Sequence, residues 1–359
     1  MNKILFLANH RPDRAPGQRF RFEQYLDFLN KNGYECEVSP LLSEKDDKIF
    51  YSKGNWMSKL FILIKCFTIR LSDVVRANKF DVVFVFREAF FTGTTYFEKK
   101  LHKSSAKVVF DFDDSIWLSN VSSANKKVEW LKNYYKTSEL IALSDLVFAG
   151  NNYLANYAAK YNSRVNIIPT TIDTDEYRRK ETSNNKICIG WSGSVTTIQH
   201  FKHAIPSLKK IKAKYGQEID IKVIGDKNYQ NKELDIHSID WAKATELEEL
   251  STFDIGIMPL PDDEWANGKC GLKGLQYMAL EIPTIMSPVG VNREIISDGN
   301  NGFLADSQDE WFEKISLLIE SEELRIRVGK EGRKTVVDHY SVTSQKNSYL
   351  DAFNKLLKA

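Results

Sequence analysis

The sequence predicts an α/β protein built from two Rossmann-like, doubly wound domains. Short apolar runs alternate with longer amphipathic stretches, which is the pattern of parallel sheets covered by helices on both faces. This alternation occurs twice along the chain. A length of 359 residues also suits two domains of roughly 150 to 180 residues, each able to bury a full core.

Six apolar runs in the first half are predicted to form strands. They are residues 3–9, 34–41, 81–87, 107–113, 146–151 and 165–170. Helical stretches lie between them. The polar segment 178–185, RRKETSNN, is typical of a linker. We therefore expect a first domain over residues 1–178 and a second over residues 186–340.

The second half repeats the pattern with five further apolar runs. They are residues 186–193, 219–226, 234–240, 254–260 and 282–287. Helical periodicity dominates beyond Phe303, and the last segment, 341–359, starts with a Ser/Thr capping signal and has an apolar stripe. We expect this segment to form a terminal helix.

Composition narrows the classes of function. Hydrophobic residues make up 42% of the chain and charged residues 27%, as in soluble globular proteins, and a net charge of +2 gives no reason to expect nucleic acid as a partner. The four cysteines show neither disulfide nor zinc spacing, so we expect a reducing, cytoplasmic setting. The early ILFLA run is too short for a signal peptide, and no apolar run is long enough to span a bilayer.

A glycine-rich stretch that opens a helix carries most of the functional signal. In GKCGLKGLQYMAL, residues 268–280, Gly268 and Gly271 let the backbone turn tightly and approach a ligand. Lys273 and the first amides of the following helix suit a phosphorylated ligand, because the helix dipole favours an anion there. The expected ligand contacts here are Lys269, Cys270, Gly271, Leu272 and Lys273.

The same stretch resembles a known half-site. After QYMAL come the apolar run IPTIMS and the turn PVGVN, and these three parts in order resemble the nucleotide-sugar half-site of the retaining glycosyltransferases of family 4 (group 1). The string IIPTTIDTDEY, residues 167–177, resembles the linker string of that family. The resemblance implies a GT-B fold, in which two Rossmann-like domains face each other across a cleft and the C-terminal helix crosses back to the first domain.

The resemblance also implies an activity. Such an enzyme moves a sugar from a nucleotide-sugar donor, held mainly by the second domain, to a saccharide or lipid-linked saccharide acceptor, held mainly by the first. It retains the anomeric configuration, needs no metal or other cofactor and serves the synthesis of cell-surface polysaccharide or other glycans. Lys273 would then stabilise the charge that develops on the departing nucleoside diphosphate. Two alternatives stay open: a sugar-nucleotide epimerase of the same fold, and a non-catalytic nucleotide-sugar-binding subunit.

The stretch departs from the family pattern at its acidic positions. Where the family places two glutamates, this chain has Gly268 and Gln276. Gln276 can still hydrogen-bond the ribose hydroxyls, although without the strength of a carboxylate. The acidic function is expected to have moved to Asp262, Asp263 or Glu264 of the PDDEWANG loop, where a carboxylate would meet hydroxyls of the donor sugar, and of these we select Glu264. The alternative is that the acidic residues of this loop are simply solvated.

A second turn, in WSGSVTTIQHF, follows the first strand of the second domain. Gly193 and Ser194 lie at this turn, and a helix is expected to open after Val195. Backbone amides there would bind a diphosphate. The alternative is ordinary helix capping by Ser194 or Thr196.

The first domain offers a basic loop after its first strand. Gly17 is expected to let this loop approach the donor sugar, while Arg19 and Arg21 would hold an anionic acceptor or a phosphate. Arg87 ends a later strand and is expected to contact the acceptor or to form a supporting ion pair. Exposed arginines on a loop are also common without any such function.

Three aspartates end the strand VVFDFDDSIW. Asp111 and Asp113 match a D-x-D pattern, in which paired carboxylates suit a divalent metal ion. We favour the other interpretation, in which Asp113 or Asp114 contacts the acceptor hydroxyl or accepts its proton, since the resemblance implies no metal. Helix capping is the structural alternative.

Residues 54–71, GNWMSKLFILIKCFTIRL, are predicted to form a largely apolar helix with basic side chains. Such a helix could rest on the surface of a membrane, giving peripheral contact at its inner face. This placement would suit an enzyme that extends a lipid-linked saccharide. The structural alternative is a crossover helix packed on the first sheet.

Overall fold

The computed structural model describes residues 1–118, 133, 135–180 and 185–358, so residues 181–184 of the predicted linker lie outside the described residues. The chain forms two compact units. One consists of Met1–Pro169 and Lys346–Ala359, and the other of Thr170–Gln345. The division falls after Pro169. Residues 170–178, which we expected in the first domain, therefore belong to the second unit.

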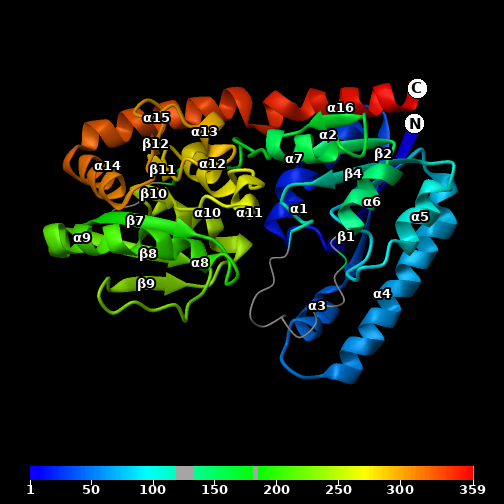
Figure 1. The fold of residues 1–359 in the computed structure, drawn as a ribbon, viewed down its shortest axis with the longest axis horizontal. Helices are drawn as coiled ribbons and strands as arrows, with labels where there is room; N and C mark the ends of the chain where they lie inside the picture. Colours follow the sequence, from blue (N-terminus) through cyan, green and yellow to red (C-terminus); the bar gives the residue numbers. More distant parts are fainter. Residues whose placement is uncertain (119–132, 134, 181–184, 359) are drawn as a thin grey trace. The chain divides into compact units, whose positions relative to one another are not determined.

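The first unit contains one sheet of six parallel strands, in the order β2-β1-β3-β4-β5-β6 (Figure 1). The strands are β1 (Asn2–His10), β2 (Tyr34–Leu42), β3 (Val82–Phe86), β4 (Lys107–Phe112), β5 (Leu146–Ala149) and β6 (Val165–Ile167). All six predicted strands are confirmed. The register pairs Ile4 of β1 with Cys36 of β2 on one side and with Val82 of β3 on the other.

Helices cover this sheet because its central strands are apolar on both faces. All five residues of β3 are buried, and Ile4 to Ala8 of β1 are completely inaccessible. The helices are α1 (Pro16–Arg21), α2 (Leu26–Lys31), α3 (Glu44–Phe50), α4 (Trp56–Arg76), α5 (Tyr96–His102), α6 (Lys136–Leu143), α7 (Asn152–Ala158) and α16 (Val342–Lys358). Tyr349 and Phe353 of α16 pack on Phe148 of β5, with ring centroids 5.2 and 5.8 Å apart.

The second unit also has six parallel strands, in the order β12-β11-β10-β7-β8-β9. The strands are β7 (Ile187–Ser192), β8 (Ile219–Ile224), β9 (Ile236–Ile239), β10 (Ile255–Met258), β11 (Thr284–Met286) and β12 (Phe303–Leu304). The five predicted strands are confirmed. The sequence does not reveal β12, because two residues are too short to show a period. The fold is therefore α/β with two doubly wound sheets, as predicted.

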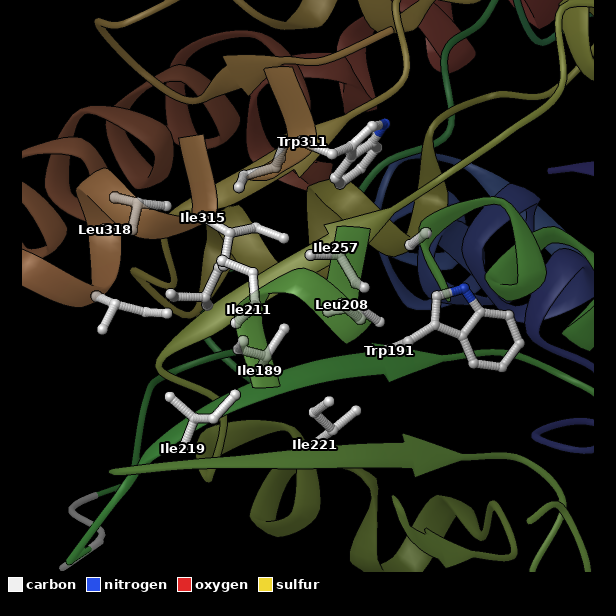
Figure 2. Packing of buried hydrophobic residues seen from close by; sticks show 14 of the residues in the cluster. Ile189, Trp191, Leu208, Ile211, Ile219, Ile221, Ile257, Trp311, Ile315 and Leu318 are labelled. Atoms are coloured by element: carbon white, nitrogen blue, oxygen red, sulfur yellow. The ribbon is translucent and has the colours of Figure 1, made fainter. Parts of the chain in front are cut away.

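The helices of the second unit bury one continuous core. They are α8 (Ile198–Phe201), α9 (Ile205–Tyr215), α10 (Lys243–Ser251), α11 (Glu264–Asn267), α12 (Leu272–Ala279), α13 (Asn292–Ile295), α14 (Gln308–Glu320) and α15 (Glu322–His339). Figure 2 shows Ile189 of β7, Ile211 of α9 and Ile315 of α14 within this cluster, and all three are fully buried. Each such side chain stabilises the unit by about 1.5–3 kcal/mol.

The strand orders predict where ligands bind. The chain reverses its direction of winding between β1 and β3 in the first sheet and between β7 and β10 in the second. In open parallel sheets, ligands bind beyond the carboxyl ends of the strands at this reversal. We therefore expect ligand-binding residues in the loops that follow β1, β3, β7 and β10.

A buried ion pair joins α1 to the first sheet. The guanidinium of Arg21 donates from Nε to Asp111 Oδ2 over 3.1 Å, and both side chains are fully inaccessible. The same guanidinium donates to the carbonyl of Ile168, and the Tyr349 hydroxyl donates to the carbonyl of Arg21. The guanidinium of Arg21 is therefore buried and already paired with Asp111, so the structure does not support the prediction that Arg21 binds the acceptor. Asp111 is likewise committed to Arg21 rather than open to a metal ion.

We expect Arg21→Met to lower the free energy of unfolding by about 3–5 kcal/mol, because it leaves Asp111 buried without its partner. Urea unfolding, followed by circular dichroism, measures this loss. Arg164→Met, at an exposed position of the same unit, is the matched control and should change the free energy by less than about 0.5 kcal/mol. The double variant Arg21→Met/Asp111→Leu should recover part of the loss; equal stability of wild type and Arg21→Met would contradict the assignment.

Candidate functional site

Two loops of the second unit meet at the reversal point of its sheet. One follows β7 and contains Gly193 and Ser194, and the other follows β10 and leads through α11 to Gly271 and α12. The sequence predicted ligand contacts in both loops. The topology explains their proximity, because β7 and β10 are hydrogen-bonded neighbours.

The turn after β7 requires glycine. A Cβ atom on Gly193 would lie 2.2 Å from Trp191 Cη2 and 2.7 Å from Thr197 Oγ1. The Gly193 amide donates to the carbonyl of Ile224 over 2.9 Å, and the Ser194 amide donates to Thr197 Oγ1 over 2.9 Å. Both amides thus donate to groups within the protein. We predicted that they would bind a diphosphate, and the structure does not support this for Gly193 and Ser194. Hydroxyl groups line the turn instead, because Ser194 Oγ lies 2.9 Å from Thr196 Oγ1.

The helix near this turn also begins later than predicted. The expected start was after Val195, whereas α8 begins at Ile198 and is only four residues long. The amides of Thr197 and Ile198 both donate to the Ser194 carbonyl, which closes a turn before the helix. The alternative, in which hydroxyl side chains satisfy the backbone locally, agrees better with the structure, because Thr197 Oγ1 accepts from the Ser194 amide.

The turn before α12 has the geometry that the sequence predicted. Gly271 adopts φ +70°, a left-handed conformation that side chains rarely take, and a Cβ atom there would lie 2.5 Å from Ile295 Cδ1. Helix α12 starts at the next residue, Leu272. Its first-turn amides have no acceptor within the helix and lie at the positive end of the dipole. Cys270 beside this turn is buried, with only 8% of its surface exposed.

The indole of Trp191 brings the two loops together. The ammonium group of Lys273 lies 5.6 Å from the centroid of this ring, within the range of a cation–π interaction. The same ring occupies the space that a side chain at Gly193 would need. One aromatic side chain at the end of β7 thus positions the turn at Gly193 on one side and Lys273 on the other.

His200 is a site residue that sequence reasoning missed. Its side chain is buried, with 4% exposed, and Nδ1 has no hydrogen-bond partner among the described residues. Burial, followed by the positive charges of Lys269 and Lys273, lowers the pKa of His200 to about 4. A buried imidazole next to two ammonium groups is suited to an anion. No local pattern predicted this contact, because about seventy residues separate the histidine from the lysines.

Gln276 is engaged inside the second unit. Its amide nitrogen donates to the Tyr177 hydroxyl over 3.0 Å and to Glu246 Oε1 over 3.1 Å, and all three side chains are buried. Trp241 donates to the same carboxylate from Nε1 over 2.9 Å. The amide nitrogen of Gln276 thus already donates to Tyr177 and Glu246, and these hydrogen bonds compete with the one that we expected to ribose. Gln276 ties α12 to α10 and to the start of the unit.

The acidic loop is exposed and partly structural. Asp263 caps α11, because its side chain accepts from the Ala266 amide over 2.7 Å. Glu264 is the first residue of this helix and is exposed. The ammonium group of Lys269 lies 5.6 Å from the Trp265 ring centroid. Asp263 is therefore structural, while Glu264 stays a predicted contact of the donor.

The first unit gathers another predicted group at the ends of β3 and β4. Arg87 donates from Nε to Asp113 Oδ1 over 2.7 Å and from one terminal nitrogen to Asp114 Oδ2 over 3.1 Å. Arg87 has φ +60°, and its amide donates to the Asp111 carbonyl. A Cβ atom on Gly17 would lie 3.2 Å from Asp113 Oδ2. The structure thus brings Gly17, Arg87 and both aspartates together.

Arg19 is less available than the sequence suggested. It retains 6% of its accessible surface, and its guanidinium lies 4.3 Å from the centroid of the Phe20 ring. A contact with the acceptor remains a prediction for this residue. At the end of β1, Nδ1 of His10 lies 3.6 Å from Oδ1 of Asp47. Arg14 donates a hydrogen bond from Nε to the other oxygen of this carboxylate over 2.7 Å.

Comparison with known proteins identifies the second unit. Residues 173–335 match the family described as glycosyl transferases group 1. The second unit is a group 1 glycosyl transferase domain. The match spans both loops, His200 and α12. No curated protein matches the chain in sequence.

Solved structures extend the likeness to the whole chain. A glycosyltransferase from Rickettsia africae has a TM-score of 0.70 at 14% identity, covering 99% of both chains. HepE from Anabaena, in complex with UDP and glucose, has a TM-score of 0.69 at 13% identity, covering 99% of this chain and 100% of that one. Sucrose-phosphate synthase from Thermosynechococcus elongatus has a TM-score of 0.71 at 12% identity, covering 100% of both. These likenesses confirm the predicted GT-B fold.

We expect His200→Gln to remove part of the acid sensitivity of the glycosyl transferase domain. The folded pKa of about 4 lies below the ordinary value of 6.5, so the unfolded chain binds the proton first. The stability present above pH 6.5 is therefore lost as the pH falls toward 4, by about 2 kcal/mol at pH 5. Chemical unfolding between pH 7.5 and 5 measures this loss.

The matched control for this experiment is His237→Gln, at an exposed position of the same unit. It should keep the pH dependence of the wild type. The same pH dependence in His200→Gln as in the wild type would show that His200 is not a buried neutral imidazole.

Proposed function

We propose that this protein transfers a sugar from a nucleotide-sugar donor to a saccharide or lipid-linked saccharide acceptor, with retention of anomeric configuration. The observation that carries the proposal is the group of Lys269, Lys273 and His200 beside the Gly193 turn, at the reversal point of a group 1 glycosyl transferase domain. Such a group of cations and a buried imidazole suits the diphosphate of the donor.

The donor side of the reaction depends on charge. When the bond between the anomeric carbon and the diphosphate breaks, negative charge develops on the departing phosphate oxygen. Lys273, Lys269 and the first amides of α12 stabilise this charge, and the Nδ1 atom of His200 supplies a further hydrogen bond. We propose that these groups serve in place of a metal ion. Gly271 and Leu272 provide the close backbone approach, while Ser194 and Glu264 meet the donor's hydroxyl groups.

The acceptor side depends on the aspartates of the first unit. We propose that Asp113 and Asp114, held by Arg87, orient the acceptor hydroxyl that attacks the anomeric carbon. The new glycosidic bond forms on the face from which the diphosphate departs. The hydroxyl proton passes to the departing phosphate, so no carboxylate nucleophile is needed. We propose that Gly17 lets its loop approach the donor sugar; a Cβ atom there would lie 3.2 Å from Asp113 Oδ2.

The class of donor and the cellular setting are also proposals. HepE is described in complex with UDP and glucose, which supports testing UDP-sugars first. We propose a function in the synthesis of cell-surface polysaccharide or other glycans, in the cytoplasm at the inner face of the membrane. Among the described residues, no helix is both long and apolar enough to cross a bilayer.

We expect wild-type protein to bind one class of nucleotide sugar, with an affinity that a chelator does not change. A calorimetric panel of UDP, GDP, ADP, TDP and CMP sugars, with and without EDTA, measures this. Lys273→Ala should weaken binding by about 10- to 100-fold, because it removes a charge-assisted contact with the diphosphate. Lys210→Ala is the matched control, since Lys210 pairs with Asp309 over 2.7 Å on the surface of the same unit.

Three outcomes would contradict this proposal in different ways. Loss of binding on chelation would mean that a metal ion holds the donor. Equal binding by Lys273→Ala and wild type would remove the lysine from the site. Failure to bind any nucleotide sugar would argue against the donor class as a whole.

We expect Asp113→Asn to lower the rate of transfer by about 100-fold or more while leaving donor affinity unchanged, because the aspartate acts on the acceptor. Release of nucleoside diphosphate in the presence of acceptors measures the rate. Asp27→Asn, at an exposed position of α2, is the matched control and should transfer normally. Conversion of the donor sugar without released nucleotide would indicate an epimerase, and binding without turnover would indicate a non-catalytic subunit.

A further inference from the structure

Helix α4 exposes a row of large apolar side chains. Trp56, Met57, Leu60, Phe61 and Ile64 are exposed by 76, 67, 52, 66 and 53% of their surfaces. Isolated exposed apolar residues are normal on a soluble protein, but five within three turns of one helix form a contiguous patch. We call these five residues the α4 apolar face. Figure 1 shows α4 as the long helix at the outer side of the first unit.

The α4 apolar face points away from the sheet. At 3.6 residues per turn its five members fall within an arc of roughly 140°. The buried residues of the helix are Ile62, Cys66, Arg70 and Asp73, and they fall on the opposite side. Ser39 of β2 and Ala89 contact this buried side through hydrogen bonds with Asp73 and Arg70. The helix is thus fully anchored without its apolar face, and the fold does not explain why that face is apolar.

The charged residues of α4 that border its apolar face are positive. Lys59 and Lys65 lie beyond its two edges, and Lys53 precedes the helix. The ammonium group of Lys59 lies 5.5 Å from the centroid of the Trp56 ring. Lys65 reaches Asp46 of α3, and α4 itself contains no acidic residue before the buried Asp73. Apolar residues bordered by lysines match a lipid surface, in which acyl chains lie beneath anionic headgroups.

We infer that the α4 apolar face docks this protein on a bilayer that contains anionic lipids. The helix would lie in the plane of the membrane, with its apolar side chains among the upper acyl chains and with Lys53 and Lys59 at the phosphate groups. Trp56 suits this position, because indole rings favour the boundary between water and lipid. A second protein chain fits less well, since the face is short and the charged residues of α4 beside it, Lys59 and Lys65, are both positive. The inference rests on the membrane placement proposed above and specifies the surface for it, but it is independent of sugar transfer, because flotation requires neither donor nor acceptor.

The test is vesicle flotation with the full-length chain. Vesicles of phosphatidylcholine alone are compared with vesicles of phosphatidylcholine and phosphatidylglycerol in a two-to-one ratio. The wild type should float with the anionic vesicles and bind the neutral ones more weakly. Leu60→Glu/Phe61→Glu should weaken binding roughly tenfold or more, because two charges would have to enter the acyl region. Leu317→Glu, at an exposed apolar position of α14, is the matched control and should float like the wild type.

A second measurement reports the orientation of the helix. Brominated acyl chains quench only those indoles that reach the lipid, so quenching of bound protein should disappear in Trp56→Phe while flotation persists. Melting curves verify that each variant is folded. Absence of flotation for folded wild type, or equal flotation of Leu60→Glu/Phe61→Glu, would overturn the inference. A wild-type dimer in light scattering that becomes monomeric in the double variant would also overturn it, assigning the face to a second copy.

Discussion

The burial of both sheets on both faces is the constraint on which the site depends. All five residues of β3 are buried, and β7 is buried at every position after its first. A parallel sheet covered in this way leaves functional side chains only one place to emerge, namely the loops beyond the carboxyl ends of its strands. Some of the predicted site residues gather there: Gly193 and Lys273 around Trp191 in the second unit, and Gly17, Asp113 and Asp114 around Arg87 in the first.

The protein separates structural charges from charges that are suited to a ligand. The buried pair of Arg21 and Asp111 joins α1 to the first sheet, and the buried pair of Arg70 and Asp73 within α4 is hydrogen-bonded to Ser39 and Ala8 of the same sheet. Removing one member of such a pair is costly, so these residues have little freedom to serve a ligand. The ammonium group of Lys273 lies 5.6 Å from the centroid of the Trp191 ring, beside the turn at Gly193. A cation–π contact positions this group at the turn without neutralising its charge.

The two proposed surfaces place different demands on the chain. The donor loops need backbone turns at Gly193 and Gly271, where a Cβ atom would collide with a neighbouring side chain. The α4 apolar face needs only exposed side chains on a helix that is already anchored from behind. The first surface is therefore sensitive to small changes in packing, whereas the second depends on the sum of apolar area and charge.

Hydrophobic period and glycine placement are local properties, and they predicted the α/β class, eleven of the twelve strands among the described residues and the turn that opens α12. Which charges are paired and which face a site depends instead on how distant segments pack. Arg21 carries the same side chain as any loop arginine, and its burial follows from Asp111, which lies far along the chain. His200 likewise meets Lys269 and Lys273 only because the strand order makes β7 and β10 neighbours. Such pairings depend on long-range topology, which no local pattern encodes.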